Sequence, residues 1–292
     1  MTAENEYDIK ELKAGGLMKL KEPDLFSIRL RVVGGRMEAA QLAALAELSL
    51  KYGRGHIHLT TRQGAEIPYV HFRDIEKIRG ELADVGLRFG ACGRRVRTIT
   101  ACQGGSCPHG LIDPQLIAQL LDGKFFGKGG MPHKFKIGIT GCPNACIKPH
   151  ENDLGVMGIV ITMHHAGRCN ACGLCVHACP VPNVLAVKDG KLVCNEEACV
   201  HCGACVAACP SDAWESTRRG YALFVGGKMG KRPRLGNRLP IEVRDEQHLL
   251  RLADAIIAWY AAEGKEGERF GDTIDRVGIG KLACALRPVE RE

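Results

Sequence analysis

All but three of the fifteen cysteines fall into groups whose spacing can bind iron–sulfur clusters. The run C-x2-C-x2-C-x3-C-P occurs twice and is the bacterial ferredoxin spacing, in which three close thiolates bind one cluster and the fourth binds the other. Zinc is the alternative, but zinc sites typically pair two C-x2-C knuckles and need neither the third and fourth thiols nor the proline. We therefore predict one 4Fe-4S cluster on Cys169, Cys172, Cys175 and Cys209 and a second on Cys199, Cys202, Cys205 and Cys179.

The third group is Cys102-x4-Cys107 followed, after 34 residues, by Cys142-x3-Cys146. Two glycines between the first pair would let the backbone approach a cluster. Pro143 is expected to begin a short helix, which would place Cys142 and Cys146 on one face and favour the thiolate form that a metal needs. Because unpaired cysteine is often buried, four free core thiols are the alternative.

Two lysines come shortly before the second half of this group. The alternating residues Phe135, Ile137 and Ile139 predict a strand with one apolar face, and Lys134 and Lys136 would project from the same side of it. The segment from residue 134 to residue 155 therefore brings ammonium groups and thiolates together.

Hydrophobic periodicity and turn residues predict an α+β protein with two domains and an insert. The first domain, residues 1–90, would begin with an irregular or helical lead-in over 1–24. It would then contain strands at 25–33, 56–61 and 66–71 and helices at 37–52 and 74–85. The second domain, residues 91–165 and 215–292, would contain strands at 96–100, 135–139, 156–162 and 221–225 and helices at 114–121 and 246–262. The cysteine-rich insert is residues 166–214, and His164 and His165 beside it are expected on the surface.

Five segments, in this order, make the chain resemble the siroheme sulfite and nitrite reductases, most closely the small anaerobic and dissimilatory-type sulfite reductases with an inserted ferredoxin. They are residues 29–35 (RLRVVGG), 59–64 (LTTRQG), 131–136 (MPHKFK), 141–146 (GCPNAC) and 226–230 (GGKMG), and the likeness spans about residues 25–290. The resemblance implies a ferredoxin-like half domain and an α/β domain that binds siroheme and a 4Fe-4S cluster, interrupted by a bacterial-type ferredoxin insert with two 4Fe-4S clusters.

One departure concerns the first cysteine pair. The family usually has five residues between these cysteines, whereas Cys102 and Cys107 enclose four, so Cys92 is an alternative ligand. Cys194 and Cys284 have no assigned partner and are interpreted as structural or incidental.

The resemblance also implies roles for single residues. The third cysteine group would hold a cluster whose Cys146 thiolate bridges to the siroheme iron. The basic residues Arg31, Arg62, Lys134 and Lys136 would bind the substrate oxygens and deliver protons. Two unit charges about 4 Å apart repel by about 4 kcal/mol at an effective dielectric near 20, so such a group of cations requires anions.

The residues expected to bind siroheme are Thr60, Thr61, Gln63, Asn144, Cys146, Gly227, Lys228, Lys231, Arg232 and Arg234. The alternative interpretation of residues 228–234 is a solvent-exposed loop that binds no siroheme.

The composition indicates a globular protein without a membrane span. Of 292 residues, 45% are hydrophobic, and the longest apolar run, residues 156–163, is far shorter than a span. The acidic N-terminus precedes no apolar stretch, so we expect a cytoplasmic protein, whose thiols stay reduced and bind metal. The net charge of +7 belongs to the apoprotein, and bound clusters and siroheme would reverse it, so we expect no nucleic-acid partner.

These inferences predict an enzyme that reduces sulfite to sulfide with six electrons, using siroheme and three 4Fe-4S clusters. Electrons from an unidentified donor would enter at the ferredoxin clusters and cross Cys146 to the siroheme iron. Nitrite reduction is an alternative, although relatives specialised for nitrite tend to have Asn where Lys136 stands, and a cluster-only electron carrier is another. Larger relatives contain two such halves facing one another, so a single copy predicts a homodimer with shared active sites.

Overall fold

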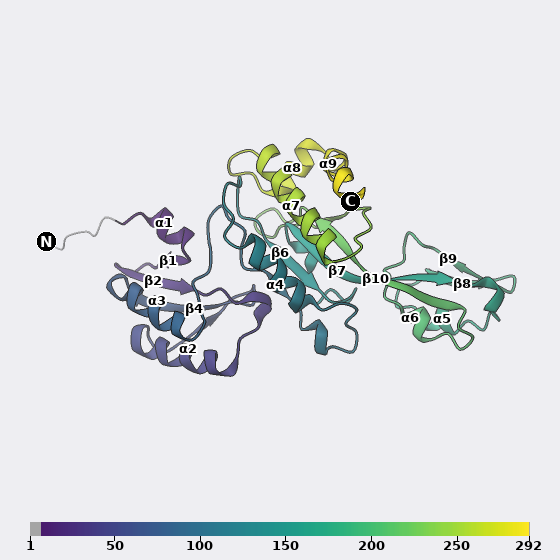
Figure 1. The fold of residues 1–292 in the computed structure, drawn as a ribbon, viewed down its shortest axis with the longest axis horizontal. Helices are drawn as coiled ribbons and strands as arrows, with labels where there is room; N and C mark the ends of the chain where they lie inside the picture. Colours follow the sequence, from purple (N-terminus) through teal and green to yellow (C-terminus); the bar gives the residue numbers. More distant parts are fainter. Residues whose placement is uncertain (1–6, 292) are drawn as a thin grey trace.

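The computed structural model describes residues 7–291, so the first six residues of the expected lead-in and Glu292 lie outside the described part. Three units follow one another along the long axis of the molecule: an N-terminal sheet, a central sheet with helices against it, and a small cysteine-rich unit at the far end (Figure 1). The predicted α+β class is confirmed. No helix within residues 7–291 is long and apolar enough to cross a membrane.

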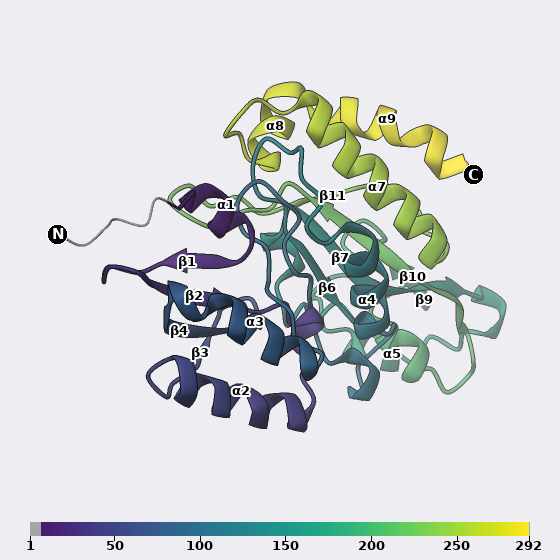
Figure 2. The ribbon, with the colours of Figure 1, turned by 60° about the vertical axis from the view of Figure 1, so that its left-hand side comes forward.

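The N-terminal unit is a four-stranded antiparallel sheet in the order β1-β2-β4-β3, with two helices packed on it (Figure 2). Its core contains Phe26, Ile28 and Ile67 from the strands, all fully buried. The elements are α1 (Ile9–Ala14), β1 (Leu17–Lys19), β2 (Leu25–Arg29), α2 (Ala39–Tyr52), β3 (His58–Leu59), β4 (Ala65–His71) and α3 (Ile75–Asp84). The strand predicted over 25–33 ends at Arg29, because the chain turns through a 3-10 helix at Val33–Gly35, in which Gly34 has φ 62°.

The central unit is a five-stranded mixed sheet in the order β11-β10-β7-β6-β5, in which β5, β6 and β7 are parallel. Four helices pack on this sheet through one hydrophobic core. The elements are β5 (Thr100–Ala101), α4 (Pro114–Phe125), β6 (Ile137–Thr140), β7 (Leu154–His164), β10 (Trp214–Val225), β11 (Asn237–Arg238), α7 (Glu246–Glu263), α8 (Phe270–Val277) and α9 (Ile279–Arg291).

Strand β6 differs from its prediction. All four of its residues are buried, so the expectation of a single apolar face is wrong. A central parallel strand is covered on both sides, so even the polar Thr140 is buried here. The strand predicted over 96–100 is reduced to β5, and Val96 forms only an isolated bridge to Phe135.

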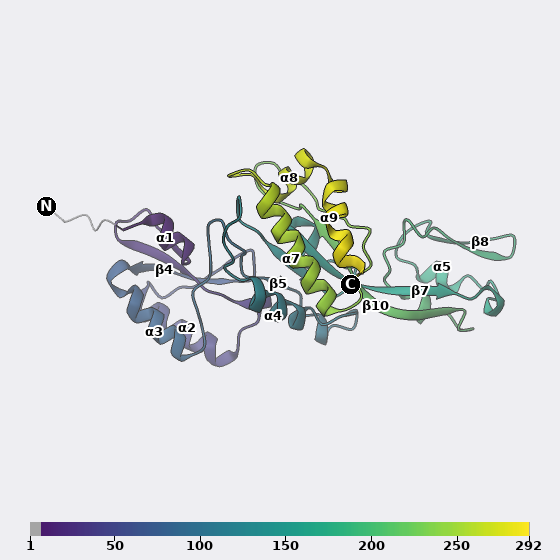
Figure 3. The ribbon, with the colours of Figure 1, turned by 45° about the horizontal axis from the view of Figure 1, so that its top comes forward.

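The cysteine-rich unit is attached to the core by the two longest strands. β7 and β10 pair from Leu154 and Val225 as far as His164 and Trp214, and they extend out of the core into this unit (Figure 3). Between these strand ends lie α5 (Leu174–Ala178), the hairpin β8 (Leu185–Lys188) and β9 (Lys191–Cys194), and α6 (Ala204–Ala207). The hairpin, α8 and α9 were not predicted from the sequence.

A buried ion pair joins the start of β7 to the helical layer. Asp153 is fully buried, and both of its carboxylate oxygens lie 2.9 Å from Nη2 of Arg269, whose side chain is 12% exposed. Asp153 also accepts the backbone N–H of Lys136 at 2.9 Å. The carboxylate therefore ties β7, the residue before β6 and the start of α8 together.

We expect Asp153→Ala to lower the free energy of unfolding by about 3–5 kcal/mol, because it leaves the Arg269 guanidinium buried without its counter-charge. Urea unfolding followed by far-UV circular dichroism measures the change. The matched control is Asp254→Ala, which removes the exposed ion pair with Lys128 and should cost less than about 1 kcal/mol. Equal costs for the two variants would show that the buried pair does not hold these elements together.

Candidate active site

A positively charged cavity of about 530 Å³ lies between the N-terminal and central units. The N-terminal unit contributes side chains from β2 and from the loop before β4, and the central unit contributes side chains from the segments before β5 and β6. The polar and charged residues that line it include Lys13, Arg29, Thr60, Thr61, Arg62, Cys92, Arg94, Arg97, His133, Lys134 and Lys136. Thr60, Thr61, Arg62, Lys134 and Lys136 were predicted site residues, and the structure brings these five together.

Besides Lys13, the unpaired ammonium groups of this cavity are those of Lys134 and Lys136. Neither ammonium group has a hydrogen-bond or ion-pair partner within the described residues. Burial, together with the positive charges of Arg62, Lys134 and Arg269, lowers the pKa of Lys136 to about 8. Burial and the charges of Arg269 and Arg97 also lower the pKa of Lys134. An anion in the cavity would relieve this repulsion and raise the pKa of both lysines.

Arg62 is held in place by acceptors from the central unit. Its Nη1 donates to Asn152 Oδ1 at 2.7 Å, and its Nη2 donates to the carbonyls of Thr98 at 3.2 Å and Ile137 at 3.3 Å. Burial lowers its pKa to about 10. The arginine therefore joins the two units at the cavity and keeps its charge there at neutral pH.

Arg31, which was predicted together with Arg62, Lys134 and Lys136, does not line this cavity. Its Nη2 lies 2.5 Å from Asp122 Oδ2 on α4, and its guanidinium lies 4.1 Å from the centre of the Phe126 ring. The Asp122 side chain is 1% exposed and needs a cation, which Arg31 supplies across the interface between the units.

Arg29 and Arg97 line the cavity but were not predicted. Arg29 pairs with Glu66 at 2.7 Å and places Nη1 2.8 Å from the sulfur of the buried Cys92. Arg97 donates to the carbonyls of Ala91 and Gly93, while its Nε is buried without a partner among the residues described. Neighbouring side chains in a strand point to opposite faces, and the position of Arg29 next to the apolar Ile28 was the available signal for Arg29.

The residues predicted to bind siroheme divide between the cavity and other places. Gln63 lies outside the cavity and forms two hydrogen bonds with the backbone of Ala101, at 2.8 and 3.0 Å, next to Cys102. Asn144 lies beside Cys142 in a separate cavity of about 540 Å³. Gln63 therefore joins the N-terminal unit to the strand that leads into the third cysteine group.

Two basic residues of the turn after β10 form ion pairs within the chain. Lys228 pairs with Asp272, and Arg234 pairs with Asp275 at 2.8 Å, both on α8. A Cβ at Gly227 would lie 2.0 Å from the carbonyl oxygen of His150, so this glycine permits close packing against the loop that follows Cys146. Lys231 and Arg232 are exposed and remain candidates for an anionic ligand.

The third cysteine group gathers at the ends of β5 and β6. Gly141 N–H donates to Cys102 Sγ at 3.0 Å. Burial raises the pKa of Cys142, and the nearby thiols of Cys102, Cys146 and Cys107 raise it further, so the four lie close together. Cys107 and Cys146 are the exposed members.

The short helix predicted from Pro143 is absent from this loop. Residues 141–148 form bends and turns instead, in which Ala145 has φ 52° and Lys148 has φ 51°. The left-handed backbone at these two residues interrupts any helix. Packing explains the turn, because the loop is pressed against β7, where a Cβ at Gly155 would lie 2.3 Å from the Pro149 carbonyl oxygen.

The cysteine-rich unit has two thiol-lined cavities. Cys169, Cys172, Cys175 and Cys209 line one of them, and Cys179, Cys199, Cys202 and Cys205 line the other, whose volume is about 570 Å³. These are the two crossed sets that the spacing predicts. Across residues 7–291, no three His, Cys, Asp or Glu side chains are close enough to hold a single metal ion.

The backbone of the two cysteine loops is nearly identical. Ala171 and His201 occupy equivalent positions with φ 55° and 56°, and each donates its N–H to the preceding cysteine sulfur, Cys169 or Cys199, at 3.4 Å. Hydrogen bonds from backbone N–H groups favour thiolates, which are the ligands of iron.

Two residues that line the larger thiol cavity, Trp214 and His164, have a buried nitrogen atom without a partner, and Trp214 also lines the smaller one. Trp214 is 8% exposed, and its Nε1, which can only donate, has no partner within the described chain. His164 Nε2 is also buried and unpartnered, so the expectation that this histidine lies on the surface is wrong for its ring, which stacks on Trp214 at 4.9 Å. A buried donor without a partner costs about 1–3 kcal/mol. Sulfur atoms of a cluster would accept these hydrogen bonds, and the residues therefore fit such a group.

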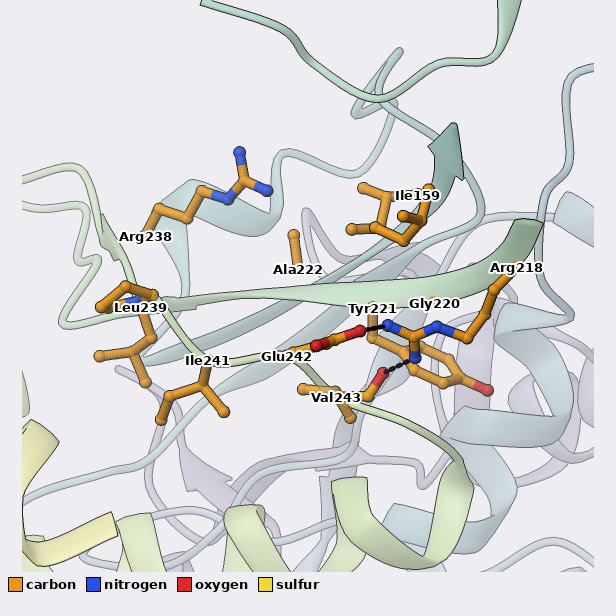
Figure 4. A pocket seen from close by; sticks show the side chains of 12 residues that line it. Ile159, Arg218, Gly220, Tyr221, Ala222, Arg238, Leu239, Ile241, Glu242 and Val243 are labelled. Atoms are coloured by element: carbon orange, nitrogen blue, oxygen red, sulfur yellow. Dashed lines mark hydrogen bonds and ion pairs between the residues drawn. The ribbon is translucent and has the colours of Figure 1, made fainter. Parts of the chain in front are cut away.

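A further cavity of about 420 Å³ lies between β10 and residues 238–243 (Figure 4). Its walls are largely aliphatic, and Arg218 at its edge is bonded to Glu242 and to the Val243 carbonyl. It contains none of the predicted site residues, so the chemistry of this protein is centred elsewhere.

Strand β6 separates the positive cavity from the third cysteine group. Lys136 lies immediately before the strand and Cys142 lies two residues after its end. At about 3.3 Å per residue, the four residues of β6 alone span about 13 Å. None of the four thiols of this group lines the positive cavity.

Two family models match the chain. One, described as the nitrite and sulphite reductase 4Fe-4S domain, matches residues 92–290, and the other, described as the nitrite/sulfite reductase ferredoxin-like half domain, matches residues 18–85. Together they span the N-terminal unit and the central unit with its insert.

Similar proteins include the coenzyme F420-dependent sulfite reductase of Methanocaldococcus jannaschii, which is 32% identical over 92% of this chain and 43% of its own length. One of the subunits of the anaerobic sulfite reductase of Salmonella typhimurium is 33% identical over 80% of this chain and 71% of its own length. The crystal structure of dissimilatory sulfite reductase I superposes with a TM-score of 0.71 at 22% identity, over 89% of this chain and 68% of that one. The chain thus spans less than half of the first relative.

We expect the affinity of the positive cavity for an oxyanion to fall as the pH rises through about 8, where Lys136 loses its proton in the free protein. Loss of one charge-assisted hydrogen bond, about 1.5–3 kcal/mol, weakens binding about ten- to a hundred-fold. Calorimetric titration with sulfate, whose charge is constant over this range, measures the effect.

Lys136→Met should bind sulfate weakly with no step near pH 8, whereas Lys281→Met, at an exposed position on α9, should behave as the wild type. A step that persists in Lys136→Met would assign the titration to another group.

Proposed function

Because the chain belongs to the nitrite and sulphite reductase family, we propose that it is a siroheme sulfite reductase that converts sulfite to sulfide. The family resemblance seen in the sequence is confirmed by these matches. The relatives that are at least 30% identical over most of this chain and have an assigned activity are named as sulfite reductases. Relatives named as nitrite reductases match either 45% of the chain at 30% identity or 93% of it at 23% identity.

The observation on which this proposal rests is the pair of unpartnered lysines in a positive cavity. Lys134 and Lys136 can each donate hydrogen bonds to the oxygens of a small oxyanion and can transfer a proton as oxygen leaves as water. With its pKa near 8, Lys136 can both give up and regain a proton close to neutral pH. Arg62 and Arg97 keep the cavity positive without losing protons.

The residues that would hold siroheme lie near this cavity and near the turn after β10. Thr60 and Thr61 line the cavity, and the exposed Lys231 and Arg232 can pair with carboxylates. Siroheme, when bound, supplies the iron that binds the substrate and passes electrons to it. The exposed thiol of Cys146 is free to reach that iron.

The three thiol groups would hold one 4Fe-4S cluster each. Cys142 and Asn144 share the cavity of about 540 Å³ with Cys202 and Gly203, so the Cys199 set lies next to the third group. The cavity of the Cys169 set is separated from the third group by the Cys199 set, and Trp214 lines both cavities of the cysteine-rich unit. All fifteen cysteines are free thiols, which supports a reducing compartment such as the cytoplasm.

The position of β6 supports a two-fold homodimer. Lysines at the beginning of the strand cannot cover a cluster held at its end, on the far side of a central strand. A second chain can place its own positive cavity over that cluster, and two-fold symmetry then completes both sites at once. The active site would thus combine cations of one protomer with thiols of the other.

The first test is anaerobic purification followed by absorption spectroscopy and pigment extraction. We expect siroheme bands, an extractable tetrapyrrole, and a larger kcat/KM for sulfite than for nitrite with reduced methyl viologen as the donor. Iron–sulfur absorption without tetrapyrrole would instead identify a cluster-only electron carrier, and faster turnover of nitrite would identify a nitrite reductase.

We expect Lys136→Asn to lower kcat for sulfite by about a hundred-fold or more, the lower end of general acid contributions. The decrease for nitrite should be smaller, because nitrite has fewer oxygens to protonate. Lys188→Asn changes an exposed lysine of the hairpin and should leave both rates unchanged. Equal decreases in kcat with sulfite and with nitrite would show that Lys136 does not determine which substrate is preferred.

Complementation between protomers tests the shared site. Lys136→Met and Cys146→Ala should each be inactive, but after co-expression half of the dimers are mixed and each mixed dimer has one intact site. Recovery of about a quarter of the wild-type activity is therefore expected. No recovery would place all of the catalytic groups within one chain.

A further inference from the structure

We propose that Cys194 is a reserve ligand for the cluster held by Cys179, Cys199, Cys202 and Cys205, able to bind its iron when one of the four thiolates is lost. The inference rests on the proposed function, because it requires a 4Fe-4S cluster in this cavity. No motif marks Cys194, which lies at the end of β9 and has no counterpart in the repeat.

The position of Cys194 is the first support. Its side chain lines the same cavity of about 570 Å³ as the four predicted ligands. It packs in the same apolar cluster as Cys179 and Cys199, and it forms no disulfide. The register of the hairpin, with Cys194 opposite Leu185, and the bond from Asn195 N–H to the Val184 carbonyl at 2.8 Å hold the thiol against this cavity.

The unpartnered donors of the cavity are the second support. His164 lines this cavity, and Trp214 lines both this cavity and the neighbouring one. The indole N–H of Trp214 and Nε2 of His164 are buried and lack partners in the described part of the chain. Both observations are explained by a sulfur-rich group in the cavity, with Cys194 beside it as a fifth thiol.

The neighbouring cavity provides a comparison within the same molecule. Cys169, Cys172, Cys175 and Cys209 are the only thiols from the described residues that line it. The cysteine loops of the two cavities have the same spacing and the same backbone conformation, so the fifth thiol is a chemical difference between them.

The exchange requires no electron transfer. The iron–sulfur bond to the lost ligand is replaced by a bond to Cys194 Sγ, and the thiol proton passes to the carboxylate of Glu196, which lines the same cavity. In this position Cys194 would preserve the cluster next to the third cysteine group when a ligand is oxidised.

The test compares Cys199→Ala with Cys169→Ala, its equivalent in the repeat. Iron and acid-labile sulfide per chain and the electron paramagnetic resonance spectrum of the reduced holoprotein are measured. Cys199→Ala should retain the iron of the wild type, whereas Cys169→Ala should lose one cluster, four iron atoms. The double variant Cys199→Ala/Cys194→Ala should lose a cluster, and Cys194→Ala alone should lose none.

Two results would overturn the proposal: equal iron loss in Cys199→Ala and Cys169→Ala, or retention of the cluster in the double variant. If Cys199→Ala does not fold, Cys179→Ala and Cys209→Ala form a second matched pair in the same two cavities. A wild-type protein without 4Fe-4S signals would contradict the proposed function itself, whereas a normal wild type with iron loss in Cys199→Ala contradicts only the role of Cys194.

Discussion

The burial of β6 on both faces is the constraint on which the rest of the site depends. A central parallel strand has its functional residues at its ends, because its interior positions are occupied by packing. Here the beginning of the strand presents Lys134 and Lys136, and its end leads into Cys142 and Cys146. The lysines and the thiols of the third cysteine group are therefore separated within one chain.

The positive cavity is built so that only a few charges remain unbalanced. Arg29 pairs with Glu66, and Arg269 behind the cavity pairs with Asp153. Neutral acceptors hold Arg62, which costs less than a second buried carboxylate would. Lys13, Lys134 and Lys136 are left without counter-charges, and a bound anion would relieve the repulsion among them. Binding strength and low intrinsic stability of the cavity thus have the same origin.

Much of this arrangement could be predicted from the sequence, because local spacing determines it. Cysteine runs, lysines two residues apart and hydrophobic periodicity each act over a few residues, and they identified the thiol sets and the lysine pair. Arg31 and Gln63 show what local spacing does not predict: both lie in family motifs, but the ion pair of Arg31 with Asp122 and the hydrogen bonds of Gln63 with Ala101 are seen only in the structure. A sequence motif does not show what its residues contact. Only the tertiary structure shows whether a residue lies at a ligand site or at the interface between two units.

The duplicated insert also shows that sequence alone does not predict which contacts a segment makes in the folded protein. Its two halves are alike in sequence and backbone, and the loop geometry that presents the thiols is therefore local. Their surroundings are not alike. A Cβ at Gly203 would lie 3.1 Å from Val160 of the core strand β7, whereas nothing lies within 4 Å of the Cβ position of its equivalent, Gly173. One half is consequently fixed against the domain that holds the third cysteine group, and the other half faces outward. Two identical ligand sets acquire different neighbours, and so different roles, through contacts that no repeat in the sequence encodes.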